Sequence, residues 1–352
     1  MLDLLSSDSL SWSCPSDNIL LPQIYHFKDR VVRGSFYVID RSPAFVPLDT
    51  KTILEKRDLK AGPHGSALAR AYCMSTLRSY PDMMCRDDGT LPPFIHLLSR
   101  PSICKTDSKR VDDYRAALPE PLAICSSIMR MYMARAPGNL AFIWRTIQAE
   151  SRRIEDEYRS YDTWNTLASI QAMTTYLILG LLDDCSEYAA DQHILMPLLS
   201  TTKRMADKLR PVFCLCNEEI QSDQIPAWEE WALVESRRRT AIILVIIIHL
   251  FSIEHASGLP QCGGFAELLL PCSKTLWQAP DQATWETEYR KQHMRCSSFG
   301  ESSKRILTYR DLLPDLQDQN DPTSASRMGY LSEWFSGMDD FGTLVTMAIS
   351  TL

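Results

Sequence analysis

The amino-acid sequence predicts a mainly α protein: an irregular multi-helix domain of packed helices with long loops and few or no strands. Three observations predict this class. Apolar residues recur at helical spacing along most of the chain, breaks rich in Pro, Gly and Asp separate these stretches, and strand-like alternation is rare. The chain has 352 residues, 45% of them hydrophobic and 23% charged, so it can bury a sizeable core.

The first part of the chain differs from the rest. Residues 1–62 are predicted to form an irregular N-terminal segment, in which only residues 31–40 combine β-branched and aromatic side chains. The first helix is predicted over residues 66–79, because its apolar side chains recur three and four residues apart. We expect Pro81 to end that helix.

A helical domain is predicted over residues 63–310. Its further helices are expected at residues 122–134, 139–158, 163–182, 188–209, 227–253 and 285–295. Residues 99–120, which are polar, are expected to form an exposed connection. Residues 311–328, with two prolines, are predicted as a loop, and residues 329–352 as one C-terminal helix that packs on the helical domain.

Residues 240–253 form the most apolar stretch of the chain. Its isoleucines favour a strand, but no Gly or Pro separates it from the charged, helix-favouring residues before it. We therefore expect one long helix whose second half is hydrophobic all round and deeply buried. The stretch is shorter than the roughly 20 apolar residues that a membrane span needs, so no membrane partner is predicted.

Charge and cysteine content indicate which kinds of partner to expect. The formal net charge is −7, whereas proteins that grip nucleic acid through phosphates usually carry a concentrated basic face. The 11 cysteines are scattered along a chain whose N-terminus shows no secretory leader, which is typical of free thiols in a reducing compartment. Neither feature predicts a nucleic-acid-binding surface.

Four short motifs follow one another from residue 77 to the C-terminal region. They are LRSYPDMM with LPPFIH (77–96), IWR with a later QA pair (143–172), WEEW, ESRRRT, LLPC and LW (228–277), and a Trp followed by GMDDFG (334–342). The residues that carry these motifs are Tyr80, Pro81, Pro92, Pro93, Trp144, Glu235, Arg238, Arg239, Pro271, Trp277, Trp334, Asp339 and Gly342. In order and spacing the motifs resemble the regulatory, or middle homology, region of fungal zinc-cluster transcription factors.

The resemblance implies a non-enzymatic regulator of transcription in the nucleus. It implies control of a metabolic or secondary-metabolite gene cluster through protein contacts or a small-molecule effector. The implied partners are other transcription regulators or a DNA-binding partner, and the resemblance implies no cofactor, no metal and no catalytic residue. Its motif residues are expected to serve the structure of the domain.

One departure from the family bears on DNA binding. The family's DNA-binding module holds two zinc ions with six closely spaced cysteines, because zinc needs about four ligands at fixed distances. This sequence has no C-x2-C pair, and its closest cysteines, Cys214 and Cys216, do not share a helix face. Direct sequence-specific DNA binding by this chain alone is therefore not expected. An alternative is that the chain is a fragment of a longer DNA-binding factor whose zinc cluster lies upstream.

The arginines of the ESRRRT motif have two interpretations. They form a patch that contacts DNA or a partner, or at least one of them pairs with Glu235 or another helix inside the fold, for which a guanidinium fork is suited. Three consecutive arginines point in three directions around a helix, which favours the internal pair. The tryptophans at 144, 164, 228, 231 and 277 are likewise expected to be packing anchors.

An enzyme is the remaining alternative. Asp183, Asp184 and Glu187 form a D-D-x-x-E string, which resembles the Mg²⁺-binding carboxylates of class I terpene synthases. Those enzymes also need a second metal-binding motif, and the sequence does not contain one. A Mg²⁺-dependent prenyl-diphosphate enzyme is therefore the less favoured reading, and we expect the chain not to be an enzyme.

Overall fold

The structure is a computed structural model, and it confirms the mainly α fold. It describes residues 64–86, 88–96, 98, 118–182, 192–209, 225–251, 268–298, 307–312 and 324–351. Within these ranges the only pairing between extended segments is an isolated antiparallel bridge between Leu269 and Thr308. The predicted segment 1–62 and most of the predicted connection 99–120 lie outside the described residues.

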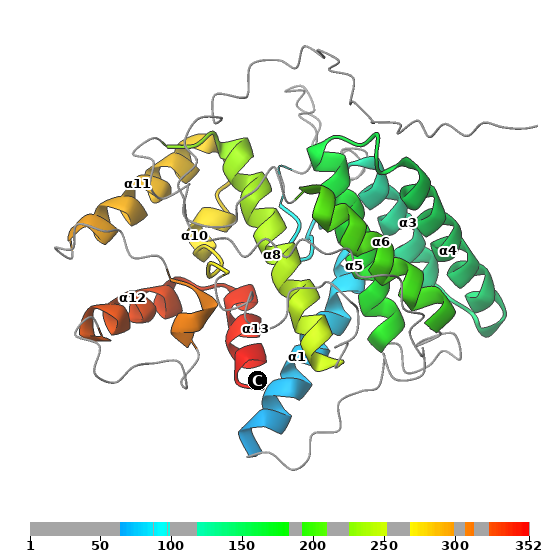
Figure 1. Cartoon of the computed structure of the whole chain (residues 1–352), viewed down its shortest axis with the longest axis horizontal. Helices are drawn as coiled ribbons and strands as arrows, with labels where there is room; N and C mark the ends of the chain where they lie inside the picture. The colour runs from blue at the N-terminus through cyan, green and yellow to red at the C-terminus, as the bar shows by residue number, and fades with distance from the viewer. Residues whose placement is uncertain are drawn as a thin grey trace, which may run out of the picture. The chain divides into compact units, whose positions relative to one another are not determined.

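The described helices follow the predicted order, except that the short helix α10 was not predicted and two helices replace the single predicted C-terminal helix (Figure 1). They are α1 (His64–Met83), α3 (Glu120–Met133), α4 (Leu140–Glu157), α5 (Thr163–Leu182), α6 (Gln192–Leu209), α8 (Trp228–Leu250), α10 (Lys274–Trp277), α11 (Gln282–Ser298), α12 (Ser324–Gly337) and α13 (Asp340–Ile349). The described residues also form a 3-10 turn at Pro137–Asn139, between α3 and α4, and another at Tyr309–Leu312.

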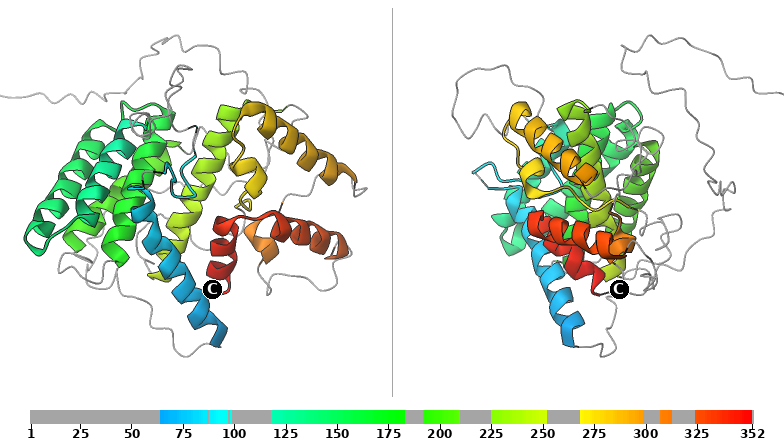
Figure 2. Two further views of the ribbon diagram at one scale, coloured as in Figure 1. Left: turned by 180° about the vertical axis from the view of Figure 1, so that it is seen from behind. Right: turned by 90° about the vertical axis from the view of Figure 1, so that its left-hand side faces the viewer.

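Helix α5 is the centre of this packing. It contacts α1, α3, α4, α6 and α8, and Figures 1 and 2 show α3, α4, α5 and α6 side by side. Every residue of α5 from Thr166 to Leu182 is buried. Because other helices surround α5, its apolar residues occur on all sides of the helix. Its sequence is therefore a long apolar run and not an amphipathic pattern.

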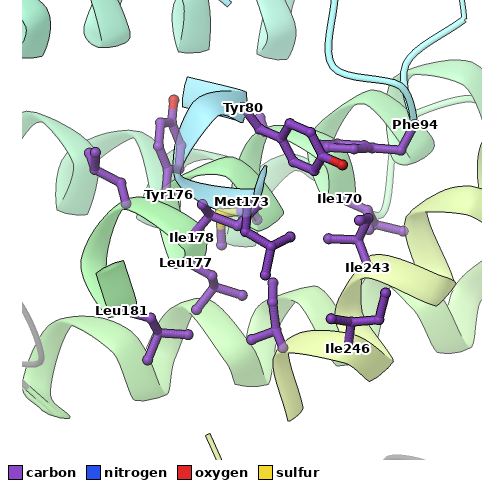
Figure 3. Close-up of a cluster of buried hydrophobic side chains, with 14 of the residues drawn as sticks. Tyr80, Phe94, Ile170, Met173, Tyr176, Leu177, Ile178, Leu181, Ile243 and Ile246 are labelled. Carbon is purple, nitrogen blue, oxygen red and sulfur yellow. The ribbon is translucent and has the colours of Figure 1, made fainter. Parts of the chain in front are cut away.

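Side chains of α1, α5 and α8 meet in the core (Figure 3). Tyr80 comes from α1, Met173 and Leu177 from α5, and Ile243 and Ile246 from α8, and each of them is at most 2% exposed. Helix α13 extends this core, because it contacts both α1 and α8. The core thus joins segments from both ends of the described chain.

Aspartate side chains cap the N-termini of several of these helices. Asp162 accepts a hydrogen bond from the Asn165 backbone N–H at 2.7 Å before α5, and Asp281 accepts one from the Thr284 N–H at 2.8 Å before α11. A side-chain oxygen at this position satisfies one of the backbone donors that a helix leaves unpaired. These caps explain why both helices begin where they do.

The C-terminal helix differs from the prediction. Instead of one helix over residues 329–352, the chain forms α12 and α13, separated at Met338 and Asp339. Asp339 has an extended backbone and its carboxylate accepts from the Gly342 N–H at 3.0 Å, so it starts a new helix. Part of the predicted loop 311–328 is also helical, because α12 begins at Ser324.

The prediction that Pro81 ends the first helix was wrong. Pro81 lies inside the last turn of α1, which continues to Met83. A proline removes only its own N–H from the helix ladder, and the Met84 N–H still bonds to the Tyr80 carbonyl at 3.3 Å. The helix therefore ends a few residues beyond the proline.

The apolar half of α8 is helical, as predicted, but it is not buried all round. Ile242, Ile243, Ile246, Ile247 and Leu250 are at most 2% exposed, whereas Leu244, Val245 and Ile248 are only partly buried. The burial follows the helical repeat, because α8 packs against α5 and α13 on one side.

Among the described helices, one is long and apolar enough to cross a membrane by length and composition, namely α5. In its most apolar window 94% of the residues are buried inside the protein. A fully enclosed core helix passes the same test, and the packing of α5 is of that kind.

Candidate functional site

Four distant parts of the chain meet at the guanidinium of Arg239 on α8. Arg239 is 0% exposed. It donates to Glu235 of the same helix at 3.0 Å, to the carboxylate of Asp339 at 2.7 Å, and to the backbone carbonyls of Pro93 and Cys272 at 3.2 Å each. We call Glu235, Arg238, Arg239, Asp339, Trp277 and Phe341 the Arg239 cluster.

Helix α8 itself supplies the first ion pairs of the cluster. Residues three and four apart share a helix face, so Arg238 and Arg239 both reach the carboxylate of Glu235. That carboxylate also accepts the Cys272 backbone N–H at 2.9 Å. Burial alone would raise the pKa of Glu235, but the two arginines and this hydrogen bond outweigh it and hold the pKa below its usual value.

Two aromatic rings enclose the same guanidinium. The Arg239 Cζ atom lies 4.0 Å from the ring centroid of Trp277 and 4.9 Å from that of Phe341. A planar guanidinium attracts the negative face of an aromatic ring. The guanidinium nitrogens of Arg239 thus bind carboxylates and carbonyls, while the rings of Trp277 and Phe341 pack against the same group.

The α12–α13 segment is attached to the cluster at two points. Asp339 pairs with Arg239 while it caps α13. The Trp334 indole N–H, on α12, donates to the Pro271 carbonyl at 2.9 Å. The second attachment runs through the short segment before α10, where Cys272 also bonds to Glu235 and Arg239, so residues 271–272 link α8 to α12.

The segment after α1 is attached in a similar way. The Tyr80 and Phe94 rings meet edge to face, with centroids 5.7 Å apart. The Phe94 carbonyl accepts from the side-chain amide of Gln171 on α5 at 2.8 Å, next to the Pro93 carbonyl that accepts from Arg239. This non-helical segment is therefore fixed by its backbone to α5 and α8.

His96 lies beside the cluster among three tryptophans. Its ring centroid is 4.7 Å from Trp277, 6.1 Å from Trp231 and 6.3 Å from Trp228. The Leu98 backbone N–H lies 3.1 Å from Nδ1, so Nδ1 accepts and Nε2 carries the proton that it donates to the Trp277 carbonyl at 3.2 Å. Burial lowers the pKa of His96 to about 4, so the ring is neutral near pH 7.

The structure brings most of the predicted site residues together. Tyr80, Pro93, Glu235, Arg238, Arg239, Pro271, Trp277, Trp334, Asp339 and Gly342 belong to the cluster or contact its members directly or through one residue. Pro81 lies in the last turn of α1, and the Pro92 carbonyl accepts the Ile95 N–H at 2.9 Å in the turn that follows. Trp144 is separate: its ring lies against Gly180 and Leu195, between α4, α5 and α6.

Of the two interpretations of the arginines, the contact patch is wrong for Arg238 and Arg239. They are 5% and 0% exposed and they pair with Glu235 inside the fold. The tryptophans at 144, 231 and 277 are buried packing residues. Those at 164 and 228 are partly buried and pack against the cluster that contains Trp231 and Trp277.

Sequence reasoning missed several members of the site. No contact in the site was predicted for Cys272, Phe341 or His96, although all three belong to the motifs named above. The same holds for Gln171, which belongs to the QA pair. The sequence does not show which backbone carbonyls accept hydrogen bonds from an arginine, because every residue has such a carbonyl. The only available hint was that the LPPFIH and LLPC motifs place rigid prolines beside these carbonyls.

The carboxylates of the enzyme alternative, Asp183, Asp184 and Glu187, lie outside the described residues, as do Cys214 and Cys216. Within the part of the chain that the structure describes, no group of three or more His, Cys, Asp or Glu side chains could hold a metal ion. The Arg239 cluster satisfies its charges internally and exposes almost none of them, so its chemistry is that of a structural centre.

No protein-family model, no curated protein and no solved structure matches this chain. The resemblance to fungal zinc-cluster factors therefore rests on the motif residues alone, and it stays a prediction.

Proposed function

We propose that this chain is a non-enzymatic regulator of transcription that acts in the nucleus of a fungal cell. In this proposal the chain resembles the regulatory part of zinc-cluster factors and controls a metabolic or secondary-metabolite gene cluster. It reaches DNA through a DNA-binding partner or other regulators, and a small-molecule effector is a candidate ligand.

One observation carries the proposal. Three of the four motif segments that resemble the family, although up to 146 residues separate the bonded pairs, contact one buried guanidinium. The residues that carry the resemblance thus contact one another in this fold, and a buried network of this kind contributes as a unit. The remaining segment, which contains Trp144, packs among the helices around α5.

The charge of the chain favours an indirect route to DNA. With a net charge of −7, and with two of its three consecutive arginines buried in ion pairs, the chain offers little of the phosphate-binding surface that duplex DNA requires. We therefore expect weak, nonspecific DNA affinity from the isolated chain.

The test is a tethering experiment. The full chain, fused to a heterologous DNA-binding module, is expected to change expression of a reporter gene in a fungal host, while the module alone does not. The Arg239→Lys variant, which disturbs the cluster, should lose the effect, and Arg290→Lys on the exposed face of α11 should keep it.

Two results would contradict the proposal. A fused chain that is folded and nuclear but leaves the reporter unchanged would argue against a regulator. Nanomolar, sequence-specific duplex binding by the chain alone would show that it reads DNA directly.

A further inference from the structure

We propose that Arg327 and the N-terminus of α12 form a binding site for the phosphate group of a small-molecule ligand. The inference rests on the proposed function in one respect, because it names the chemical class of the effector that such a regulator would bind. Two independent observations carry it: a buried arginine without a partner, and a helix start that holds no acidic residue.

Arg327 is buried but unpaired. It is 7% exposed, and its Nε atom is enclosed by the protein without a hydrogen-bond partner. Among the described residues its guanidinium also forms no ion pair and no ring contact. A guanidinium keeps its charge, and a buried charge is costly unless it is paired. An anion bound to Arg327 therefore stabilises the folded chain.

The other buried arginines of the described chain are paired. Arg238 and Arg239 are 5% and 0% exposed, and both form ion pairs with Glu235. Arg327 is buried nearly as deeply as Arg238, yet it has no such carboxylate. The unpaired guanidinium is thus a feature of this one site and not of buried arginines in this protein generally.

Helix geometry directs Arg327 toward the start of α12. The helix begins at Ser324, so Arg327 is its fourth residue, and helical side chains lean toward the N-terminus of their helix. Tyr330, Leu331 and Trp334 share a helix face with Arg327. Tyr330 and Leu331 are 5% and 4% exposed, and Trp334 donates a hydrogen bond to the segment before α10. This face is therefore turned toward the protein, and Arg327 is not a solvated surface charge.

The start of α12 supplies further donors for an anion. The first backbone N–H groups of a helix have no partner within the helix, and the helix dipole places partial positive charge there. Helix α12 has 14 residues and no Asp or Glu in its first turn, so no carboxylate of that turn offsets this charge. A phosphate group suits the combination, because its oxygens accept from several N–H groups and from a guanidinium fork at once.

Acidic residues that precede α12 in the sequence define the alternative. Asp315, Asp318 and Asp321 lie outside the described residues, and an ion pair between one of them and Arg327 would make this arginine structural. The two cases differ in what removal of the arginine does. Breaking a buried ion pair destabilises a protein strongly, whereas replacing an unpaired buried charge by an apolar side chain of similar volume does not.

The experiment measures thermal unfolding of the full chain in inorganic phosphate and in sodium chloride of equal ionic strength. For a Kd on the order of 1 mM, about 10 mM phosphate should raise the unfolding midpoint by about 2 °C relative to chloride. Isothermal titration calorimetry measures the Kd directly. Glycerol 3-phosphate, a simple phosphate monoester, should bind at least as tightly as inorganic phosphate, and acetate should bind more weakly.

Variants locate the site. Arg327→Met removes the charge and is expected to weaken phosphate binding about tenfold or more, while the midpoint in chloride stays at or above that of the wild type. Arg327→Lys should keep part of the binding. Ala325→Asp places a carboxylate in the first turn of α12, so it should raise the midpoint in chloride and weaken phosphate binding.

The matched control is Arg290→Met, which removes an exposed arginine of α11 and should leave the Kd for phosphate unchanged. Circular dichroism should show that all variants are folded.

Three outcomes would overturn the inference. A clearly lower midpoint of Arg327→Met in chloride would show that the arginine is paired within the chain. A phosphate response that persists in Arg327→Met, or that Arg290→Met loses equally, would show a nonspecific ion effect. Acetate that binds as tightly as phosphate would show that the site is not selective for phosphate.

Mass spectrometry of the chain purified from a fungal host separates two sources of a phosphate group. A bound small molecule is released when the chain is denatured, whereas a phosphorylated residue keeps its phosphate. A phosphorylated Ser or Thr at the start of α12, with no released ester, would overturn the small-molecule source.

The reporter experiment separates this inference from the proposed function. If the wild-type chain changes the reporter but binds no phosphate, the regulator proposal stands and the phosphate site is rejected. If the chain binds phosphate through Arg327 but changes no reporter, the site stands and the proposed function fails.

Discussion

Arg239 shows what a single buried charge can organise. Removing a guanidinium from water is costly, and the cost is offset only when its hydrogen bonds and its charge are both satisfied. Here two carboxylates, two backbone carbonyls and two aromatic rings surround one side chain. The side chain therefore fixes the relative positions of α8, α10, α13 and the segment after α1.

The first prediction concerns the shape of this group. In Arg239→Lys the charge remains, but an ammonium cannot form the planar fork or contact both rings, so Asp339 and Glu235 lose part of their pairing. We expect the free energy of unfolding to fall by about 3–5 kcal/mol, as for other broken buried pairs, measured by urea denaturation.

Arg290→Lys is the control, because its pair with Glu286 is exposed and exposed pairs contribute about 0–1 kcal/mol. Equal losses in the two variants would show that the Arg239 cluster has no special role in stability.

The second prediction concerns His96 and pH. Its pKa is about 4 in the folded chain, below the usual 6.5, because burial disfavours the charged ring. Below pH 6.5 the unfolded chain binds a proton that the folded chain does not. The contribution of neutral His96 is therefore complete above pH 6.5 and is lost as the pH falls toward 4.

The loss should reach about 3 kcal/mol, since each pKa unit corresponds to about 1.4 kcal/mol. Urea denaturation of the wild type and of His96→Gln between pH 7 and pH 4 measures it. We expect the wild type to lose more stability than the variant over this range, and parallel curves would contradict the assignment.

At the scale of helices, the third prediction concerns Asp339, which both caps α13 and pairs with Arg239. Asp339→Asn can keep the cap but loses the charge, whereas Asp339→Ala loses both. Asp162→Ala, at the start of α5, removes only a cap and should cost about 1 kcal/mol.

We therefore expect stability to fall in the order Asp162→Ala, Asp339→Asn, Asp339→Ala, measured as thermal and urea midpoints. If Asp339→Ala costs no more than Asp162→Ala, the ion pair to Arg239 contributes nothing beyond the cap.

The helices also show what the sequence could predict. The bounds of α5 were predicted correctly as 163–182, because an aspartate precedes a long apolar run. The break before α13 was missed although its signals are present: α12 ends at Gly337, and Asp339 stands three residues before Gly342. A short apolar helix such as α13 is easily predicted as part of the preceding helix when the capping residue between them is not considered.

At the scale of the whole molecule, the site was predictable only in part. The i, i+3 and i, i+4 spacing places Arg238 and Arg239 beside Glu235 from sequence alone. The carbonyls of Pro93 and Cys272 could not be predicted, because 146 and 33 residues separate them from Arg239 and their positions depend on how loops cross the core. The periodicity of apolar residues predicts single helices, and it does not show where the loops between them lie.

The last prediction therefore concerns the C-terminal helix as part of the whole core. Phe341, Leu344 and Val345 of α13 are 0% exposed, and α13 contacts α1 and α8. Removing a large buried apolar side chain typically costs about 2–5 kcal/mol, while a domain is stable by only about 5–15 kcal/mol. A chain that ends at Met338 loses all three side chains and the carboxylate of Asp339, so we expect it not to hold the native fold at 25 °C.

The measurements are near-UV circular dichroism, binding of a dye that reports exposed apolar surface, and the cooperativity of urea unfolding. The control is Met347→Ser in the full chain, a residue of the same helix that is 36% exposed, which should keep a cooperative transition near the wild-type midpoint. A truncated chain that unfolds cooperatively at that midpoint would show that α13 is an appendage of the core. Loss of the transition would show that the four segments around Arg239 fold only together, because α8 then carries a buried charge whose partner from α13 is gone.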